Sequence, residues 1–251
     1  MRLLRYLVDG TAHYGILDGS DVYALIGDPL RIATAGNRLG ELDAVHLLPP
    51  CVPSKIIAVG LNYPYPSPDG QLPLPDEPIL TLKPPSSLIA SGQEICWPRL
   101  SSRIDFEGEM ALVIGKQTHD VEPSDARASI LGVTCANDVT ARDLQRRDGQ
   151  WARAKGFDTF CPLGPCIATQ IDPDNCHLVT RVNREVRQDV STAQLHFAPT
   201  VLISYISKIM TLVPGDVILT GTPPGSGALK RGDVVDVEID GVGVLTNRVS
   251  S

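Results

Sequence analysis

The sequence predicts a mainly β fold of the α+β class with few helices. Short runs that alternate apolar and polar residues, or that are continuously apolar and β-branched, recur along the whole 251-residue chain. Few segments have helical spacing, and they do not alternate regularly with the strands. A doubly wound parallel sheet requires that alternation, so it is not expected here.

The first fifty residues are expected to form a small β-rich segment. Asp-Gly and Gly-Ser turns separate its predicted strands, and residues 27–50 are mixed and have room for a short helix. Prolines at 49, 50 and 53 mark the best boundary, which divides the chain into segments 1–50 and 51–251. The three predicted strands are RLLRYLVDG (2–10), AHYGILDG (12–19) and DVYALIG (21–27).

Strands continue to dominate beyond the boundary. KIIAVGLNY (55–63) predicts a buried strand with a polar tip, and residues 64–78 predict a loop, because six of these fifteen residues are proline. A long loop after a strand is typical of a lid or a site rim. One helix is expected from Thr140 and an amphipathic one over 199–212. The other β-like runs are 80–89, 109–116, 130–139, 216–221, 233–240 and 241–249, with a hairpin over 177–190 that turns at Asn183-Arg184.

Charge and composition exclude several classes of protein. The net charge is −7 and there is no run of Lys or Arg, so no nucleic-acid partner is expected. No stretch approaches eighteen apolar residues and the N-terminus lacks the features of a signal peptide, so we expect a cytoplasmic protein without membrane contact. The six cysteines form no C-x-x-C pair, and we expect them to be reduced.

Two carboxylates stand two residues apart at the start of an apolar strand. Side chains alternate between the faces of a strand, so Glu107 and Glu109 point the same way, and a positive charge is expected between them. Asp138 occupies a similar place at the end of the run 130–139. Three carboxylates form an oxygen-only site that suits Mg²⁺ first, with Mn²⁺ or Ca²⁺ as alternatives. The competing interpretation is an exposed strand face with alternating acids.

The chain resembles the fumarylacetoacetate hydrolase family from about Ile56 to Val249. The matching stretches, in chain order, are VGLNY, LKPPSSLI, DFEGEMALVIGK, ANDVTARDLQ, QWARAKGFDTFCPLGP, VNREVRQD and PGDVILTGTPPGSG. The resemblance implies a mixed β-roll, or flattened barrel, with few helices, usually as a homodimer. It also implies that Glu107, Glu109 and Asp138 bind Mg²⁺ or a similar ion.

The resemblance further implies the kind of chemistry. Substrates of the family are small anionic keto acids such as acylpyruvates or oxaloacetate, and its reactions are C–C bond hydrolysis, decarboxylation and isomerisation through one metal-bound enolate. Lys155 matches a lysine that binds the substrate or stabilises the enolate. Arg142 and Gln145 match residues that line the pocket, and Arg142 suits a carboxylate clamp. Residues of the matching motifs that are further candidates for substrate binding are Thr222, Gly221, Asn62 and Tyr63, with Lys83 and Ser86 at the border of the pocket.

One motif departs from the family pattern. Hydrolytic members carry N-Y-x-x-H-x-x-E at the strand tip, where the His and Glu act on a water molecule. Here Pro66 stands at the His position and Asp69 at the Glu position, so Asp69 is the candidate base. Because proline carries no titratable group, hydrolysis competes with isomerisation, tautomerisation or decarboxylation, which demand less of a base.

Two readings outside this chemistry remain open. A binding protein that kept the fold and the metal site but lost turnover is one of them. A thiol enzyme that uses Cys161 or Cys166 is the other, and neither cysteine has a visible His partner in the sequence.

Overall fold

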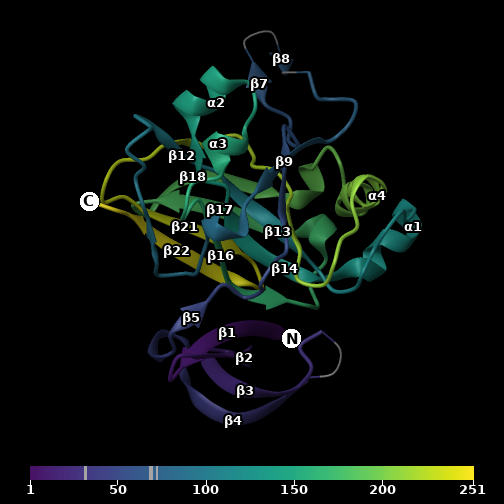
Figure 1. Ribbon diagram of the computed structural model, residues 1–251, viewed down its shortest axis with the longest axis vertical. Coiled ribbons are helices and arrows are strands. Elements are labelled where there is room, and N and C mark those ends of the chain that lie inside the picture. The colour runs from purple at the N-terminus through teal and green to yellow at the C-terminus, as the bar shows by residue number, and fades with distance from the viewer. Residues whose placement is uncertain (31–32, 68–69, 72) are drawn as a thin grey trace.

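The computed structural model describes residues 1–30, 33–67, 70–71 and 73–251. The chain is mainly β, as predicted, with mixed sheets that do not close into a barrel in the described part. Figure 1 shows one layer of strands at the bottom of the molecule and a larger body above it. None of the described helices is long and apolar enough to cross a membrane.

The N-terminal segment forms antiparallel strands, as predicted. They curve together below the main body (Figure 1) and are β1 (Arg2–Val8), β2 (Thr11–Asp18), β3 (Asp21–Gly27) and β4 (Ala33–Glu41). The short helix expected within 27–50 is only the 3-10 turn η1 (Leu42–Ala44), followed by β5 (Leu47–Leu48). A longer helix fails because residues 33–41 pair with β3.

The main sheet is continuous from the N-terminal strands into the larger body. Its strand order is β4-β3-β2-β1-β16-β14-β13-β19-β6-β9, with β10 on β16 and β5 on β1. Because β1 pairs directly with β16, the division of the chain at residue 50 stays a prediction. The strands not yet given are β6 (Ile56–Gly60), β9 (Ile79–Lys83), β10 (Leu88–Ile89), β13 (Gly108–Ile114), β14 (Ile130–Asn137), β16 (Cys161–Ala168) and β19 (Val217–Leu219).

A second sheet packs against the main sheet. Its order is β11-β22-β21-β17-β18, and it contains the predicted hairpin, in which Asn183 and Arg184 both take left-handed backbone angles. Two positive φ values are what a two-residue type I′ turn requires. Its strands are β11 (Glu94–Ile95), β17 (His177–Val182), β18 (Glu185–Ser191), β21 (Val234–Ile239) and β22 (Gly243–Val249).

Two small sheets lie near the top of the molecule in Figure 1. The first is β15-β12-β20 and the second is β7-β8, within the proline-rich segment. Their bounds are β12 (Ile104–Phe106), β15 (Thr140–Ala141), β20 (Gly227–Ala228), β7 (Pro66–Ser67) and β8 (Gly70–Gln71).

The helices are few and short. The amphipathic helix was predicted correctly, and the helix expected from Thr140 begins two residues later, because Thr140 pairs with Asp105 in a strand. The helices are α1 (Pro123–Ala126), α2 (Arg142–Asp148), α3 (Ala152–Lys155) and α4 (Pro199–Ile209), with 3-10 turns η2 (Pro85–Ser87), η3 (Arg127–Ser129), η4 (Pro173–Asn175) and η5 (Thr192–Gln194).

Strand β13 carries the site because its two faces differ. Met110 and Leu112 point into the larger apolar core, which includes residues of the second sheet and α4. Ala111 and Val113 point the other way, into a second apolar cluster with β6 and β19. Glu109 continues the face of Ala111, at the end of the strand where that cluster gives way to a cavity. The strand therefore presents a carboxylate at the edge of an apolar core.

Candidate functional site

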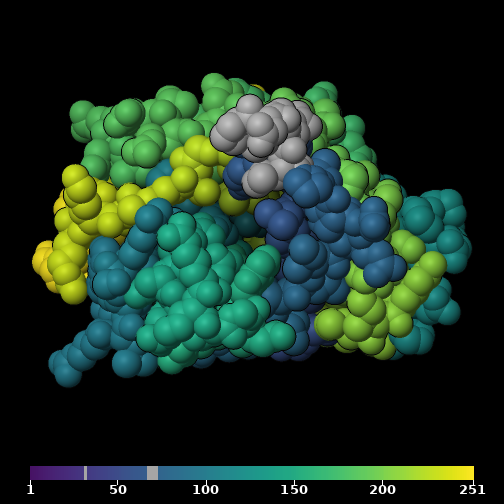
Figure 2. Space-filling model, turned by 90° about the horizontal axis from the view of Figure 1, so that it is seen from above, coloured from purple at the N-terminus to yellow at the C-terminus, as the bar shows by residue number. Residues whose placement is uncertain are grey.

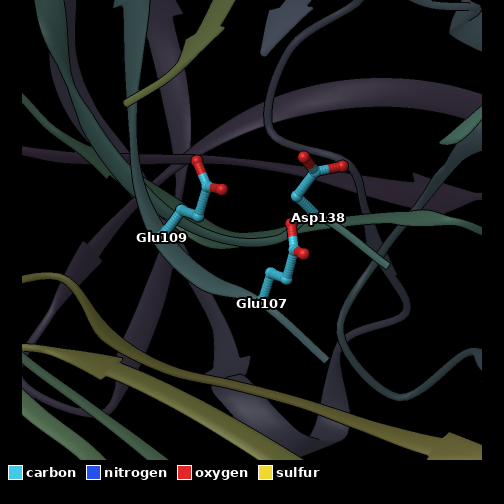
Figure 3. A group of neighbouring side chains, drawn as sticks. All are labelled: Glu107, Glu109 and Asp138. Atoms are coloured by element: carbon cyan, nitrogen blue, oxygen red, sulfur yellow. The ribbon is translucent and has the colours of Figure 1, made fainter. Parts of the chain in front are cut away.

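Three carboxylates converge at the ends of two paired strands. Glu107 lies between β12 and β13, Glu109 is the second residue of β13, and Asp138 follows β14. Strands β13 and β14 are antiparallel, with Glu109 opposite Ala136, and the Asp138 amide donates to the Glu107 carbonyl oxygen at 2.8 Å. One carboxylate oxygen from each acid lies within 4.8 Å of the others, and Figure 3 shows the three groups turned toward one another. The prediction that they share one place is confirmed.

The expected positive charge inside the cluster is an ammonium group. Lys155, the last residue of α3, places Nζ 2.9 Å from Glu107 Oε2 and in short contact with Asp138 Oδ2. Lys83 Nζ lies 2.6 Å from Asp138 Oδ1, so two buried lysines share that carboxylate. Although burial opposes its charge, the carboxylates of Asp138, Glu107 and Glu109 raise the pKa of Lys155 above its usual range. Lys155 is therefore protonated at neutral pH.

The two lysines favour the ionised form of Asp138. Burial disfavours its charge, but the charges of Lys155 and Lys83 hold its pKa below the ordinary value. Glu109 is in the opposite situation. Burial and the neighbouring negative charge of Asp138 raise its pKa well above the ordinary value. The Gly221 amide donates a hydrogen bond to Glu109 Oε2 at 2.6 Å. The cluster thus carries more carboxylate than its lysines neutralise locally.

This donor set fits a hard divalent cation. The oxygens of Glu107, Glu109 and Asp138 are buried and close together, and no histidine or cysteine among the described residues joins the group, as suits Mg²⁺ or Mn²⁺. A divalent ion would also supply the positive charge that Glu109 lacks. The fit extends to these three carboxylates and does not distinguish one hard ion from another.

Each side-chain nitrogen of Arg142 binds another residue of the site. Nε donates to Asp105 Oδ2 at 2.9 Å, Nη1 donates to Gln145 Oε1 at 2.6 Å, and Nη2 forms a short contact with Glu107 Oε1. The guanidinium lines the cavity and holds Glu107 and Gln145 in place, and its role as a clamp for a substrate carboxylate stays a prediction. Burial of Asp105, with 3% of its surface exposed, makes this ion pair costly to break.

Gln188 connects the second sheet to the carboxylate strand. Its Oε1 accepts from the Gly108 amide at 3.1 Å, and its Nε2 donates to Thr222 Oγ1 at 2.7 Å and to the Pro223 carbonyl oxygen at 2.8 Å. Gly108 is required here, because a Cβ would lie 1.9 Å from Thr180 Oγ1. The glycine between the two glutamates lets the strand that carries them pack directly on the second sheet.

The carboxylates form the floor of a cavity of about 660 Å³. Seen from above, the surface is hollowed between the segment of α2 and α3 and the segment that follows β6 (Figure 2). The residues that line it are Ala58, Val59, Gly60, Leu61, Tyr65, Thr81, Asp105, Glu107, Glu109, Asp138, Arg142, Gln145, Arg146, Trp151, Lys155, Thr222 and Ser226. Among these described residues there is no histidine.

The remaining predicted residues have different positions. Thr222 lines the cavity, and its hydroxyl donates to the Gly108 carbonyl oxygen at 2.8 Å. Gly221 acts through its amide on Glu109, as described above. Asn62 is fully buried behind the cavity, where its amide nitrogen donates to the carbonyl oxygens of Thr220 and Phe197. It anchors backbone and does not line the cavity.

Tyr63 lines a neighbouring apolar cavity of about 220 Å³, also next to Tyr65. Lys83 does not line the main cavity but forms a buried ion pair with Asp138, which does. Ser86 is exposed and also does not line that cavity. Pro66 is exposed, and Asp69 lies outside the described residues. Its role as a base stays a prediction.

Sequence reasoning missed several residues of the site. Asp105 precedes Glu107 by two residues, so the same alternation that paired Glu107 with Glu109 could have found it. Gln188 lies in the stretch VNREVRQD, and nothing in that stretch indicates that it binds Gly108 and Thr222. Tyr65 and Trp151 line the walls of the cavity. The Trp151 ring packs directly on Gly60, where a Cβ would lie 2.6 Å from the ring. These contacts join distant segments and leave no local pattern.

Comparison with known proteins gives consistent results. Residues 55–250 match the family model described as fumarylacetoacetate (FAA) hydrolase C-terminal, and residues 1–50 match the one described as Rv2993c-like, N-terminal. A protein of Archaeoglobus fulgidus is 53% identical over 206 residues, which cover 82% of each chain. The human mitochondrial protein named oxaloacetate tautomerase FAHD2B is 43% identical over 219 residues, covering 82% of this chain and 70% of that protein.

Solved structures resemble the whole chain. The crystal structure named 2-hydroxyhepta-2,4-diene-1,7-dioate isomerase from Mycobacterium marinum has a TM-score of 0.92 and 39% sequence identity, covering 100% of this chain and 98% of that one. Both the small N-terminal segment and the larger body are therefore shared with that protein.

Proposed function

The chain belongs to the fumarylacetoacetate hydrolase family, and from this premise we propose that it catalyses tautomerisation or isomerisation of a small anionic oxo acid in the 660 Å³ cavity. The relatives named above as a tautomerase and an isomerase support this choice. Oxaloacetate in its enol form is the first substrate to test. C–C bond hydrolysis, the other reaction that the family resemblance allows, is the competing outcome.

One observation carries the choice of reaction. The cavity combines three clustered carboxylates and a buried ammonium group with no histidine among its described lining residues. The His13, His46, His119, His177 and His196 side chains all lie outside that lining. Activation of water for C–C hydrolysis needs a positioned base. Pro66 stands at the position where hydrolytic members of the family carry a histidine. Interconversion of enol and keto forms does not need an activated water molecule.

We propose a divalent cation, Mg²⁺ or Mn²⁺, as the cofactor. Glu107, Glu109 and Asp138 would hold it. When bound, such an ion supplies Lewis-acid charge stabilisation to neighbouring substrate oxygens.

Lys155 is the proposed electrostatic residue. Its Nζ carries a proton at neutral pH because three carboxylates surround it, so it acts as a hydrogen-bond donor and positive charge, and not as a base. A donor fixed in a buried site stabilises the negative charge that develops on the oxygen of an enolate. The bond changes of the reaction are small. The enol O–H proton leaves oxygen, and a proton is added to the carbon at the other end of the enol double bond.

Other residues hold the carboxylates of the proposed metal site in position. Arg142 fixes Glu107 and Gln145, Lys83 fixes Asp138, and the Gly221 amide fixes Glu109. Tyr65 closes the wall by donating its hydroxyl to the Thr222 carbonyl oxygen at 2.8 Å. The geometry is therefore set by residues that need not touch the substrate.

A substrate comparison tests the proposal. Metal-stripped protein is supplied with Mg²⁺ and assayed separately for ketonisation of enol-oxaloacetate, for decarboxylation of oxaloacetate, and for cleavage of acetylpyruvate. We expect faster ketonisation without cleavage. Cleavage of acetylpyruvate would replace the proposal with hydrolysis and would direct attention to Asp69. Metal binding without turnover of any of the three would favour a binding protein.

A further inference from the structure

Helix α2 presents two arginines to the cavity, Arg142 and Arg146. They are four residues apart and so lie on one face of the helix, about one turn of 5.4 Å apart along its axis. The Arg142 side chain is 18% exposed and reaches the carboxylate floor, whereas Arg146 is an exposed residue of the cavity wall. The same helix face thus carries one inner and one outer guanidinium group.

The inner arginine is committed to holding residues of the site. All three of its nitrogens are bound, to Asp105, Gln145 and Glu107. Turning it toward a substrate would take one of two cations away from each of the buried carboxylates of Asp105 and Glu107, which is unfavourable. A cation without such partners is therefore better placed to bind a substrate carboxylate at this wall.

The outer arginine has no partner in the described part of the chain. No hydrogen bond or ion pair joins the Arg146 guanidinium to a described residue. The next two arginines along the chain differ, since Arg147 and Arg153 both pair with Asp148, at 3.5 and 2.5 Å. The unpaired arginine is the one that faces the cavity.

The ion pairs of the floor carboxylates do not involve Arg146. Asp105, Glu107 and Asp138 pair with four other cations, which are Arg103, Arg142, Lys83 and Lys155, and Glu109 is bound by the Gly221 amide. Arg146 is therefore an additional positive charge at the cavity rim. In a protein of net charge −7, such a charge offsets the repulsion that a doubly negative ligand would meet.

We propose that Arg146 binds the second carboxylate of a dicarboxylic substrate, and so determines specificity for small oxo-dicarboxylic acids over monocarboxylic ones. The inference rests on the proposed function, since it assumes that the oxo-acid end of the substrate lies against the Glu107, Glu109 and Asp138 cluster. A guanidinium group matches a carboxylate with two parallel hydrogen bonds. The separation of one helical turn suits a short dicarboxylic acid that spans from the floor to the rim.

Equilibrium binding tests this without any turnover. Malate and 2-hydroxybutyrate have the same 2-hydroxy acid end, and only malate has the second carboxylate. Both are titrated calorimetrically, with Mg²⁺ present, into the wild-type protein and the variants Arg146→Gln, Arg146→Lys and Arg147→Gln. Arg147 is the matched control, because it is adjacent, exposed and paired with Asp148 outside the cavity. Unchanged melting temperatures verify folding.

We expect the wild type to bind malate about tenfold more tightly than 2-hydroxybutyrate, the value of one partly exposed charge-assisted contact. Arg146→Gln should remove this preference, Arg146→Lys should keep part of it, and Arg147→Gln should keep all of it. Equal wild-type binding of the two acids, or unchanged malate preference in Arg146→Gln, would overturn the inference. If the preference depends on Arg146 but enol-oxaloacetate is not turned over, the carboxylate site stands and the proposed function fails.

Discussion

The ammonium nitrogen of Lys155 lies 2.9 Å from Oε2 of Glu107, inside the group of carboxylates that suits a divalent cation. Lysine and metal would therefore compete for the same oxygens. A bound cation would weaken the hold of Glu107 and Asp138 on Lys155, whose ammonium group would then be free to donate to a substrate oxygen.

Replacing Lys155 by Met should separate stability, metal binding and activity. Glu107 and Asp138 would keep Arg142 and Lys83 but lose the buried ammonium group that they share, so the metal-free protein should lose about 3–5 kcal/mol of unfolding free energy. Mg²⁺ should restore part of that loss and should bind more tightly than in the wild type, while ketonisation falls by about 10²–10³-fold. Thermal unfolding and calorimetry with and without Mg²⁺ measure these effects. Exposed Lys116→Met is the control, and weaker Mg²⁺ binding in Lys155→Met would contradict the competition.

Replacing Glu109 by Gln should have opposite effects on stability and metal binding. The amide keeps the size of the side chain and its contact with the Gly221 amide, but removes a buried charge that has no ion-pair partner in the described part of the chain. We expect the metal-free protein to be at least as stable as the wild type. Mg²⁺ affinity should fall by more than about 100-fold, because even residues behind metal ligands are worth 10–100-fold. An unchanged Mg²⁺ affinity would exclude Glu109 as a ligand.

The raised pKa of Glu109 predicts how pH acts on the metal-free protein. Burial and the charges of Asp138 and Glu107 favour its protonated form in the folded state. The stabilising contribution of that proton is fully present below the unfolded-state pKa and is lost as pH rises through the folded-state pKa. Metal-free wild type should therefore lose more stability than Glu109→Gln as pH rises above about 4.5, the ordinary value for glutamate.

The same group predicts proton release on metal binding. Since Mg²⁺ binds the carboxylate form, its affinity should increase with pH over the range in which Glu109 titrates. Calorimetry in buffers of different ionisation enthalpy measures the released protons directly. Parallel stability curves for wild type and Glu109→Gln, together with no proton release, would show that Glu109 is ionised before metal binds.

Gln188 should affect the metal site although it lies on the other sheet. Gln188→Ala leaves the Gly108 amide and the Pro223 carbonyl oxygen without their partner, so unfolding free energy should fall by about 2–4 kcal/mol. The strand between Glu107 and Glu109 loses its support, so Mg²⁺ affinity should also fall about tenfold. Exposed Gln194→Ala serves as the control. A loss of stability with full Mg²⁺ affinity would limit Gln188 to a structural role.

Much of the fold could be predicted from local pattern. The hairpin at Asn183-Arg184 and helix α4 follow from alternation, helical spacing and turn residues that act over a few positions. Residues 33–41 were harder, because their strand depends on pairing with β3. The start of α2 was shifted by the pairing of Thr140 with Asp105, which joins segments 35 residues apart.

The site was predictable to the extent that one strand builds it. The alternation of Glu107 and Glu109 and the similar position of Asp138 were enough to bring the three acids together. The sharing of Asp138 between Lys83 and Lys155 was not predictable, since it joins β9, the end of β14 and α3 across the fold. Spacing along the chain carries no information about such contacts.

The most direct test measures ketonisation of enol-oxaloacetate by metal-stripped wild-type protein before and after Mg²⁺ is restored, with Glu107→Gln treated in the same way. The loss of enol absorbance gives the rate above that of buffer with the same Mg²⁺ concentration. We predict acceleration in the wild type that requires Mg²⁺, and little or none in Glu107→Gln. Equal rates with and without metal, or a fully active Glu107→Gln protein, would contradict an active site built on these carboxylates.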